Sequence, residues 1–192
     1  MAENDFQTDI RACITTLKNG GLILYPTDTV WGIGCDATNV NSIKKVFELK
    51  KRPDAKNMIV LVAEERDILH YISAPNIYAL NYSKTVQKPT TIVYQDPVGL
   101  ADNLVGSNRS IAIRIVRDTF CKQLIKQYGK PIVSTSANTS GGATPKNFDE
   151  ISDQIKRGVD YAVHYRRSDM TPHEPSAIIS FNQDGTFNIL RP

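Results

Sequence analysis

The segment from Pro131 to Gly142, Pro-Ile-Val-Ser-Thr-Ser-Ala-Asn-Thr-Ser-Gly-Gly, gathers side chains that suit an anionic ligand. Serine, threonine and asparagine donate hydrogen bonds, and glycine lets backbone N–H groups approach a ligand closely. The β-branched Ile132 and Val133 follow a proline, which predicts a short buried strand that leads into a polar loop. No Gly-Lys-Ser/Thr follows the glycines, so the loop is not a Walker motif. Composition alone fits an ordinary polar loop equally well.

A second group of polar residues lies at the end of a predicted helix. Lys50 and Arg52 flank Lys51, and Pro53 should end the helix because the residue before a proline avoids the helical region. Across a terminating turn the two side chains can converge on one ligand. A compact ammonium and a planar guanidinium together neutralise phosphates well. The alternative is a solvated helix end whose cations complement the helix dipole.

Two single residues also stand out from their surroundings. Arg114 interrupts the apolar run from Ile111 to Val116, where a charge needs a partner or an anionic ligand unless it lies on an exposed strand. Asp28, in the segment Pro26-Thr-Asp-Thr29, is the one acid inside a candidate site loop. Its alternative role is to cap or brace that turn.

The sequence lacks the motifs and residue spacings of several common kinds of catalytic site. The three histidines show no metal-ligand spacing with one another or with the three cysteines, so we expect no metal site. There is no Gly-x-Ser-x-Gly elbow, and no pair of acids stands out from the charged background. Cations, hydroxyls and one amide are therefore the groups left as candidates for a site.

Composition describes an ordinary globular chain. Its 192 residues are 41% hydrophobic and 22% charged, and a net charge of +3 permits nucleotide or nucleic-acid binding without arguing for it. The scattered, odd-numbered cysteines fit reduced thiols. No apolar run approaches the roughly 18 residues of a membrane span, and no signal peptide precedes the chain. We therefore expect a cytoplasmic protein without membrane contact.

Strand-length apolar runs alternate with segments of helical period, which favours an α/β fold with a largely covered sheet. We expect one domain, residues 1–192. Predicted helices centre on Ile10–Leu17, Ile43–Phe47, Leu69–Ile72, Ile77–Tyr82, Phe120–Tyr128 and Ile151–Ile155. Predicted strands are Leu22–Tyr25, Val30–Gly34, Met58–Val62, Thr91–Tyr94, Ile111–Ile115 and a hairpin of Ser176–Phe181 with Thr186–Leu190 about Asp184-Gly185.

Four motifs occur in the order seen in YrdC-like proteins, the family of L-threonylcarbamoyladenylate synthases. They are Tyr25-Pro-Thr-Asp-Thr-Val-Trp-Gly-Ile-Gly34, Lys50-Lys-Arg-Pro53, Ile111-Ala-Ile-Arg114 and Ser134-Thr-Ser-Ala-Asn-Thr-Ser-Gly141. The chain resembles the short, single-domain form of this family. The resemblance implies a twisted mixed sheet flanked by helices, with a concave basic cavity.

The resemblance also implies a reaction and a set of site residues. ATP, L-threonine and bicarbonate would be the substrates of a nucleotidyltransferase that serves tRNA modification, with Mg²⁺ expected beside ATP but no protein ligand named for it. Its catalytic and ATP-binding residues would be Lys50, Arg52, Ser136 and Asn138, with Ser134 and Arg191 as further nucleotide contacts. Its threonine-binding residues would be Thr27, Arg114 and Ser176.

Partners and departures follow from the same resemblance. Proteins that carry out the later threonylcarbamoyl transfer, and tRNA or double-stranded RNA, are the expected partners. Asp28 replaces the commoner glutamate of its motif, and Leu61 stands where many longer relatives carry a histidine. One alternative is a non-enzymatic RNA-binding module that uses the same basic cavity. A related carbamoyl-transfer domain of hydrogenase maturation lies in much longer chains.

Overall fold

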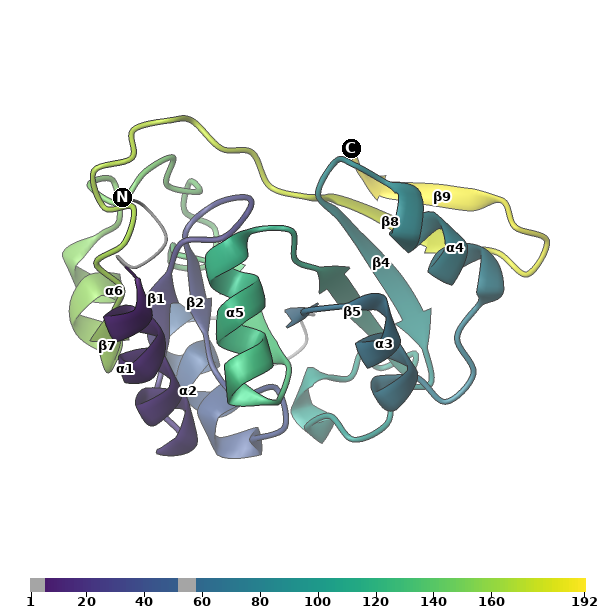
Figure 1. Cartoon of the computed structure of the whole chain (residues 1–192), viewed down its shortest axis with the longest axis horizontal. Helices are drawn as coiled ribbons and strands as arrows, with labels where there is room; N and C mark the ends of the chain where they lie inside the picture. Colours follow the sequence, from purple (N-terminus) through teal and green to yellow (C-terminus); the bar gives the residue numbers. More distant parts are fainter. Residues whose placement is uncertain (1–5, 52–57) are drawn as a thin grey trace.

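A nine-stranded mixed sheet runs through the computed structural model, which describes residues 6–51 and 58–192 (Figure 1). The strand order is β7-β1-β2-β6-β3-β5-β4-β8-β9. The strands are β1 Ile23–Tyr25, β2 Gly32–Gly34, β3 Ile59–Val62, β4 Thr90–Gln95, β5 Ser110–Ile115, β6 Ile132–Ser136, β7 Tyr161–Ala162, β8 Ala177–Phe181 and β9 Phe187–Arg191. The helices are α1 Gln7–Lys18, α2 Val40–Lys50, α3 Glu65–Tyr71, α4 Ile77–Thr85, α5 Thr119–Tyr128 and α6 Asp153–Gly158, with a 3₁₀ turn at Asp102–Leu104.

Apolar spacing and capping explain where the helices form. Helix α1 buries Ile10, Cys13 and Leu17, which recur at three- and four-residue intervals along one face. Helix α5 begins after Asp118, whose carboxylate accepts the N–H of Cys121, and ends at a left-handed glycine. Figure 1 shows α1 and α5 side by side in front of the sheet, with α3 and α4 over its other end.

Strand β6 links the two halves of the sheet. It pairs antiparallel with β2 on one side and with β3 on the other, while β3 runs parallel to β5. The register places Ser136 opposite Gly32, and it places Ser134 opposite Ile59. On the next ladder Arg114 lies opposite Leu61. Segments far apart in the sequence therefore reach one region of the sheet.

The predicted α/β fold is confirmed, and so is the C-terminal hairpin about Asp184-Gly185. The predicted loop after Val133 begins too early, because pairing with β2 keeps the strand extended through Ser136. The last predicted helix also begins later than expected, at Asp153, after the N-cap Ser152.

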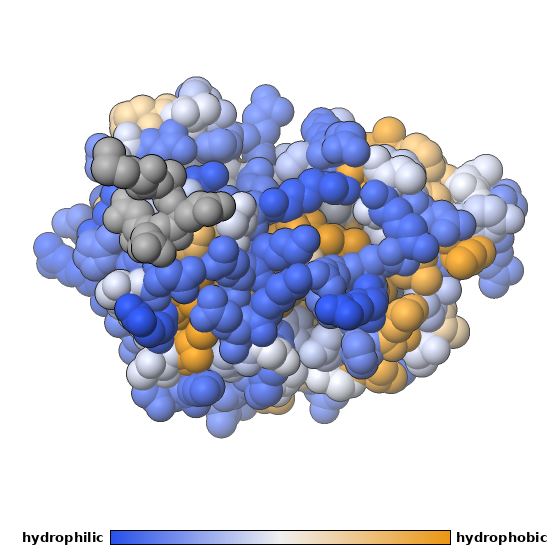
Figure 2. All heavy atoms as spheres, in the orientation of Figure 1, coloured by the Kyte–Doolittle hydropathy of each residue, from blue (hydrophilic) through white to orange (hydrophobic). Residues whose placement is uncertain are grey.

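The expectation of a largely covered sheet is wrong at one end. Strand β9 pairs only with β8 and is exposed along most of its length. Figure 2 shows a largely hydrophilic face whose apolar areas on the right lie at this end of the molecule. Exposed apolar side chains here are Ile77 and Tyr78 of α4 and Phe187, Ile189 and Leu190 of β9. Among the described residues, no helix has both the length and the apolar character needed to cross a membrane.

Candidate functional site

A cavity of about 330 Å³ opens on one face of the sheet, where β2, β6, β5, β8 and β9 meet. Two guanidiniums, of Arg114 and Arg191, lie in its wall, and no carboxylate does among the described residues. Hydroxyl groups make up most of the remaining polar wall, and they come from Thr29, Ser134, Thr135, Ser136, Thr144 and Ser176. Donors without a facing acid favour an anionic ligand.

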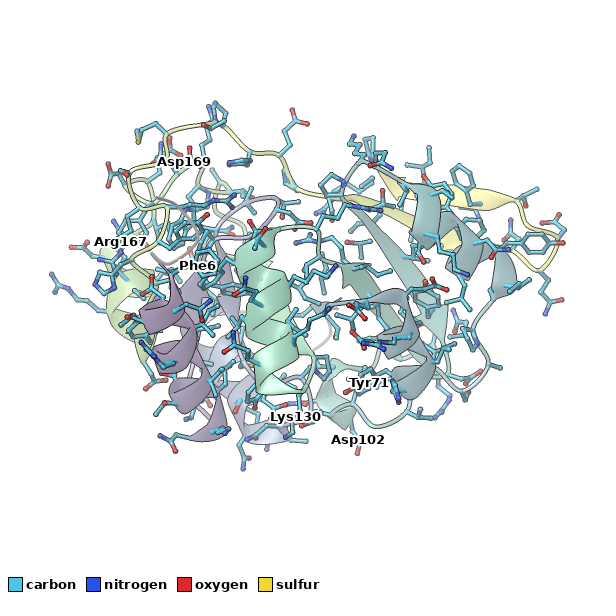
Figure 3. All side chains as sticks on the ribbon, in the orientation of Figure 1. Phe6, Tyr71, Asp102, Lys130, Arg167 and Asp169 are labelled. Carbon is cyan, nitrogen blue, oxygen red and sulfur yellow. The ribbon has the colours of Figure 1, made fainter. Side chains whose placement is uncertain are left out.

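A second cavity, of about 360 Å³, lies between α3 and α5. Its floor includes Val62, whereas the first cavity includes Ile59, so strand alternation places the two on opposite faces of the sheet. Tyr71 and Lys130 lie at this second cavity in Figure 3. The Lys130 ammonium is 2.9 Å from the carboxylate of Asp36, and the other two cations of this cavity, Arg66 and Lys126, pair with Glu64. Acids therefore already neutralise these cations, and the first cavity is the better anion site.

Arg114 is held in the cavity wall by an acid behind it. The side chain is only 3% exposed on β5, and its Nη2 lies 3.0 Å from Oδ1 of Asp28. The other Asp28 oxygen accepts the backbone N–H of Arg117 at 3.3 Å. Asp28 therefore has two roles. It braces the β1–β2 loop, and it is the ion-pair partner that the buried charge of Arg114 requires. The Nε of Arg114 forms no hydrogen bond with any described residue.

Arg191 brings a second guanidinium from the last strand. Its Nε and Nη2 donate to the carbonyl oxygen of Ser176 at 3.0 and 2.8 Å. Burial and the nearby positive charge of Arg114 lower the pKa of Arg191 from its usual value. Arg191 and Arg114 both line the cavity, so two like charges lie close together there. Arg114 has a carboxylate partner, whereas Arg191 forms no ion pair with another described residue.

Lys50 is buried, which contradicts the alternative of a solvated helix end. Its Nζ donates to the carbonyl oxygens of Ser136 and Asn138, each at 2.5 Å, and its own carbonyl accepts the N–H of Ser140 at 2.8 Å. The end of α2 thereby holds the segment that follows β6. Arg52, the other predicted cation of this group, lies outside the described residues.

Hydrogen bonds within the segment after β6 fix its shape. The hydroxyl of Ser136 donates to Oδ1 of Asn138 at 2.5 Å, and Nδ2 of Asn138 donates to the carbonyls of Thr139 and Gly142. Ser134 lies on β6, beside β2 in the sheet, and a Cβ on Gly32 would come within 2.9 Å of its Oγ. Glycine at position 32 therefore leaves room for the Ser134 hydroxyl.

The residues predicted to contact an amino acid lie in two places. Ser176 lines the cavity, and its hydroxyl is 2.8 Å from that of Thr91. Thr27 is not among the lining residues, and its hydroxyl donates to the carbonyl of Val30 at 2.8 Å. Thr29 lines the cavity instead. It belongs to the same motif as Thr27, but the sequence analysis did not single it out, and the motif itself does not rank its two threonines.

No group of three or more histidine, cysteine, aspartate or glutamate side chains could hold a metal ion within the described ranges. The cysteines in these ranges are all buried and none forms a disulfide. Desolvation raises the pKa of Cys13 and Cys35 far above the usual thiol value. Their thiols are therefore poor nucleophiles and poor metal ligands.

The protein is thus of the α/β class, and one face of its mixed sheet carries a polar cavity that contains two arginines. The chain belongs to the Sua5/YciO/YrdC family, whose model, described as "Telomere recombination", matches residues 15–192. The family resemblance inferred from the four motifs is confirmed.

Curated relatives and solved structures agree with this assignment. A Pseudoalteromonas translucida protein named threonylcarbamoyl-AMP synthase is 33% identical over 162 residues, which make up 82% of this chain and 86% of that protein. E. coli YciO superimposes with a TM-score of 0.82 at 21% identity, over 96% of this chain and 89% of that one. P. abyssi Sua5 complexed with L-threonine gives a TM-score of 0.84 at 22% identity over 96% of this chain, which spans 54% of the Sua5 chain. At these identities the two structures establish the shared fold.

Proposed function

We propose that this protein is a threonylcarbamoyl-AMP synthase, which makes threonylcarbamoyl-AMP and pyrophosphate from ATP, L-threonine and bicarbonate. The observation that carries the proposal is the cavity in which Arg114, Arg191 and several hydroxyls face a ligand with no lining carboxylate among the described residues. Relatives that are 33% identical over most of the chain bear this enzyme name. The threonine in the related Sua5 structure gives the substrate class further support.

The residues fit a reaction that needs positioning and charge neutralisation. The amine of threonine first forms a C–N bond with bicarbonate, which loses water, or with carbon dioxide, in which case the amine loses a proton, and a carbamate results. A carbamate oxygen then attacks the α-phosphorus of ATP, the bond to the bridging oxygen breaks, and pyrophosphate leaves with that electron pair. Arg114 would hold the carboxylate of threonine, since its side chain lines the cavity and a guanidinium can pair with a carboxylate through two N–H groups.

The phosphates would lie along the wall that β6 forms, at Ser134 and Ser136, with Asn138 hydrogen-bonded to Ser136 behind them. Lys50 holds the backbone of this segment, so its charge lies behind the hydroxyl groups that would face the nucleotide. The Asn138 amide already bonds Ser136, Thr139 and Gly142, so its contribution would be to shape this wall. Arg191 and the predicted Arg52 would add positive charge. Mg²⁺ would arrive on the triphosphate as part of the substrate, because the described residues contain no acidic cluster to hold it.

The proposal extends to the setting of the enzyme. Threonylcarbamoyl-AMP is a mixed anhydride of a carbamate and a phosphate, so its use requires a transferase that accepts the threonylcarbamoyl group and releases AMP. We propose that the synthesis of threonylcarbamoyl-AMP takes place in the cytoplasm. Contact with tRNA or double-stranded RNA stays a prediction of the sequence analysis.

Pyrophosphate release tests the proposed function directly. We expect release only when ATP, threonine and bicarbonate are all present, and we expect valine to be a poor substitute. A site built around a substrate hydroxyl leaves polar groups unpaired when that hydroxyl is missing. Equal release with valine, or with no amino acid, would overturn the threonine assignment. RNA binding with no pyrophosphate release under any of these conditions would favour the RNA-binding alternative.

A further inference from the structure

Thr91 lies on β4 between the two arginines of the cavity wall. Strands β5, β4, β8 and β9 are neighbours in the sheet (Figure 1). Thr91 pairs with Ile178 of β8, and Ile178 pairs with Arg191 of β9. The antiparallel register of β4 with β5, continued by one residue, places Thr91 beside Arg114. Because paired residues point to the same face of a sheet, Thr91 shares the face of Ile178, which lines the cavity.

The Thr91 hydroxyl has one hydrogen-bond partner among the described residues, the hydroxyl of Ser176 at 2.8 Å. Both residues are buried, Thr91 at 0% and Ser176 at 1% exposure. Nη2 of Arg191 lies 3.4 Å from the same Ser176 oxygen, and a guanidinium can only donate. Ser176 therefore accepts a hydrogen bond from Arg191, and only the direction of the bond between the two hydroxyls remains open.

Burial decides that direction. If Ser176 donated to Thr91, the Thr91 hydrogen would point to no acceptor among the described residues, and an unpaired buried donor costs free energy. Thr91 therefore donates, and Ser176 accepts from both Thr91 and Arg191. A hydroxyl has two lone pairs and one hydrogen, so the hydrogen of Ser176 remains for a ligand in the cavity that this residue lines.

We propose that Thr91 is a positioning residue that makes the Ser176 hydroxyl a hydrogen-bond donor to an oxyanion of a substrate. The inference rests on the proposed function. Thr91 itself is not among the residues that line the cavity, so it acts through Ser176. The oxyanion is a carboxylate or a phosphate, since both only accept hydrogen bonds from the arginines and from Ser176. L-threonine carries the first and ATP carries the second.

Calorimetric titrations of the full chain with L-threonine and with ATP and Mg²⁺ test this role. Ser176→Ala removes the donor and should weaken binding of the ligand that carries the oxyanion about tenfold. Thr91→Val keeps the shape of the side chain and should weaken binding of the same ligand about fivefold. The double variant should bind no more weakly than Ser176→Ala alone, because Thr91 acts only through Ser176. The ligand that loses affinity identifies the oxyanion as carboxylate or phosphate.

Two further variants separate the hydrogen bond from a general effect on the strand. Thr91→Ser keeps the hydroxyl and should bind both ligands as wild type does. Thr90 is the next residue of β4, and strand alternation directs its side chain to the opposite face. Its hydroxyl donates to the carbonyl oxygen of Lys88 at 2.9 Å. Thr90→Val should therefore leave both affinities within about twofold of wild type.

The outcomes separate this inference from the function on which it rests. Three results would overturn the role of Thr91 while the enzyme assignment stands: unchanged affinity for both ligands in Thr91→Val, an equal loss in Thr91→Ser, or losses that multiply in the double variant. A wild-type chain that binds neither ligand would overturn both. If Thr91→Val loses its cooperative thermal transition, a comparison of Thr91→Cys with Thr91→Ser isolates the same hydroxyl, because a thiol is a weak donor.

Discussion

Removing Asp28 from its ion pair with Arg114 should cost the folded protein several kcal/mol, about 3–5 for a typical buried pair. Arg114 is 3% exposed on an interior strand, and the Asp28 side chain is 9% exposed. Their oxygen and nitrogen are 3.0 Å apart. Asp28→Asn keeps the size and shape of the side chain but removes the charge that neutralises Arg114.

The expected loss follows from the burial of the remaining charge. Removing one member of a buried pair typically costs about 3–5 kcal/mol, since the other charge stays desolvated. We expect the lower end, about 3 kcal/mol, because Arg114 also lines an open cavity into which it can turn. For a chain of this length that loss corresponds to a fall of about 6–12 °C in Tm.

An exposed pair elsewhere in the protein provides a matched control. Arg109 Nε and Asp96 Oδ1 are 3.1 Å apart, but their side chains are 71% and 61% exposed. Asp96 has a positive φ of 52°, which asparagine tolerates well, so Asp96→Asn is a clean substitution. An exposed pair contributes less than about 1 kcal/mol, and Tm should fall by less than about 4 °C.

Chemical and thermal unfolding of the two variants decide the question. Adding Arg114→Met to Asp28→Asn should recover most of the lost stability, because it removes the charge left unpaired. If Asp28→Asn costs no more than Asp96→Asn, the stability of Arg114 does not depend on Asp28. A double variant less stable than Asp28→Asn alone would equally refute the ion-pair argument.

Two further predictions concern other buried polar groups. Lys50→Ala and Asn138→Ala should each slow adenylate formation, measured as pyrophosphate release, and the double variant should lose less than the product, because Lys50 donates to the Asn138 carbonyl; strictly multiplicative losses would contradict a shared unit. Burial alone would raise the pKa of Asp9, but hydrogen bonds from Tyr161 and the His164 backbone outweigh it and lower the pKa. The carboxylate therefore stabilises the fold above its unfolded pKa of about 4, and this contribution disappears as the pH falls through the lower folded pKa. Denaturation at pH 3 and pH 7 should show a smaller pH effect in Asp9→Asn than in wild type, and equal pH effects would contradict this role.

Local patterns were sufficient to predict the fold class and most elements. The apolar positions Ile10, Cys13 and Leu17 recur at helical spacing, and all three are buried on α1. Gly185 has the positive φ of 88° that its place in the predicted hairpin requires. In both cases the determining interactions lie within a few residues of one another, so they can be recognised from the local sequence.

Long-range pairing explains what the sequence did not reveal. Ser134 and Ser136 extend a strand because Ile59 and Gly32 pair with them, and neither partner is near them in the chain. Lys50 is buried because the carbonyls that follow β6 reach the end of α2. The residues next to Ser134, Ser136 and Lys50 in the sequence give no local sign of either contact.

The arginines of the cavity illustrate how the fold creates a property that no segment has alone. Arg114 lies on β5 and Arg191 on β9, with β4 and β8 between these strands in the sheet. Arg114 has a carboxylate partner in Asp28, whereas Arg191 has a carbonyl and a hydroxyl from Ser176. The two guanidiniums and the single carboxylate leave one uncompensated positive charge, and burial beside Arg114 lowers the pKa of Arg191. An anionic ligand relieves that repulsion, so the contacts that bring the two guanidiniums together favour the binding of a carboxylate or phosphate.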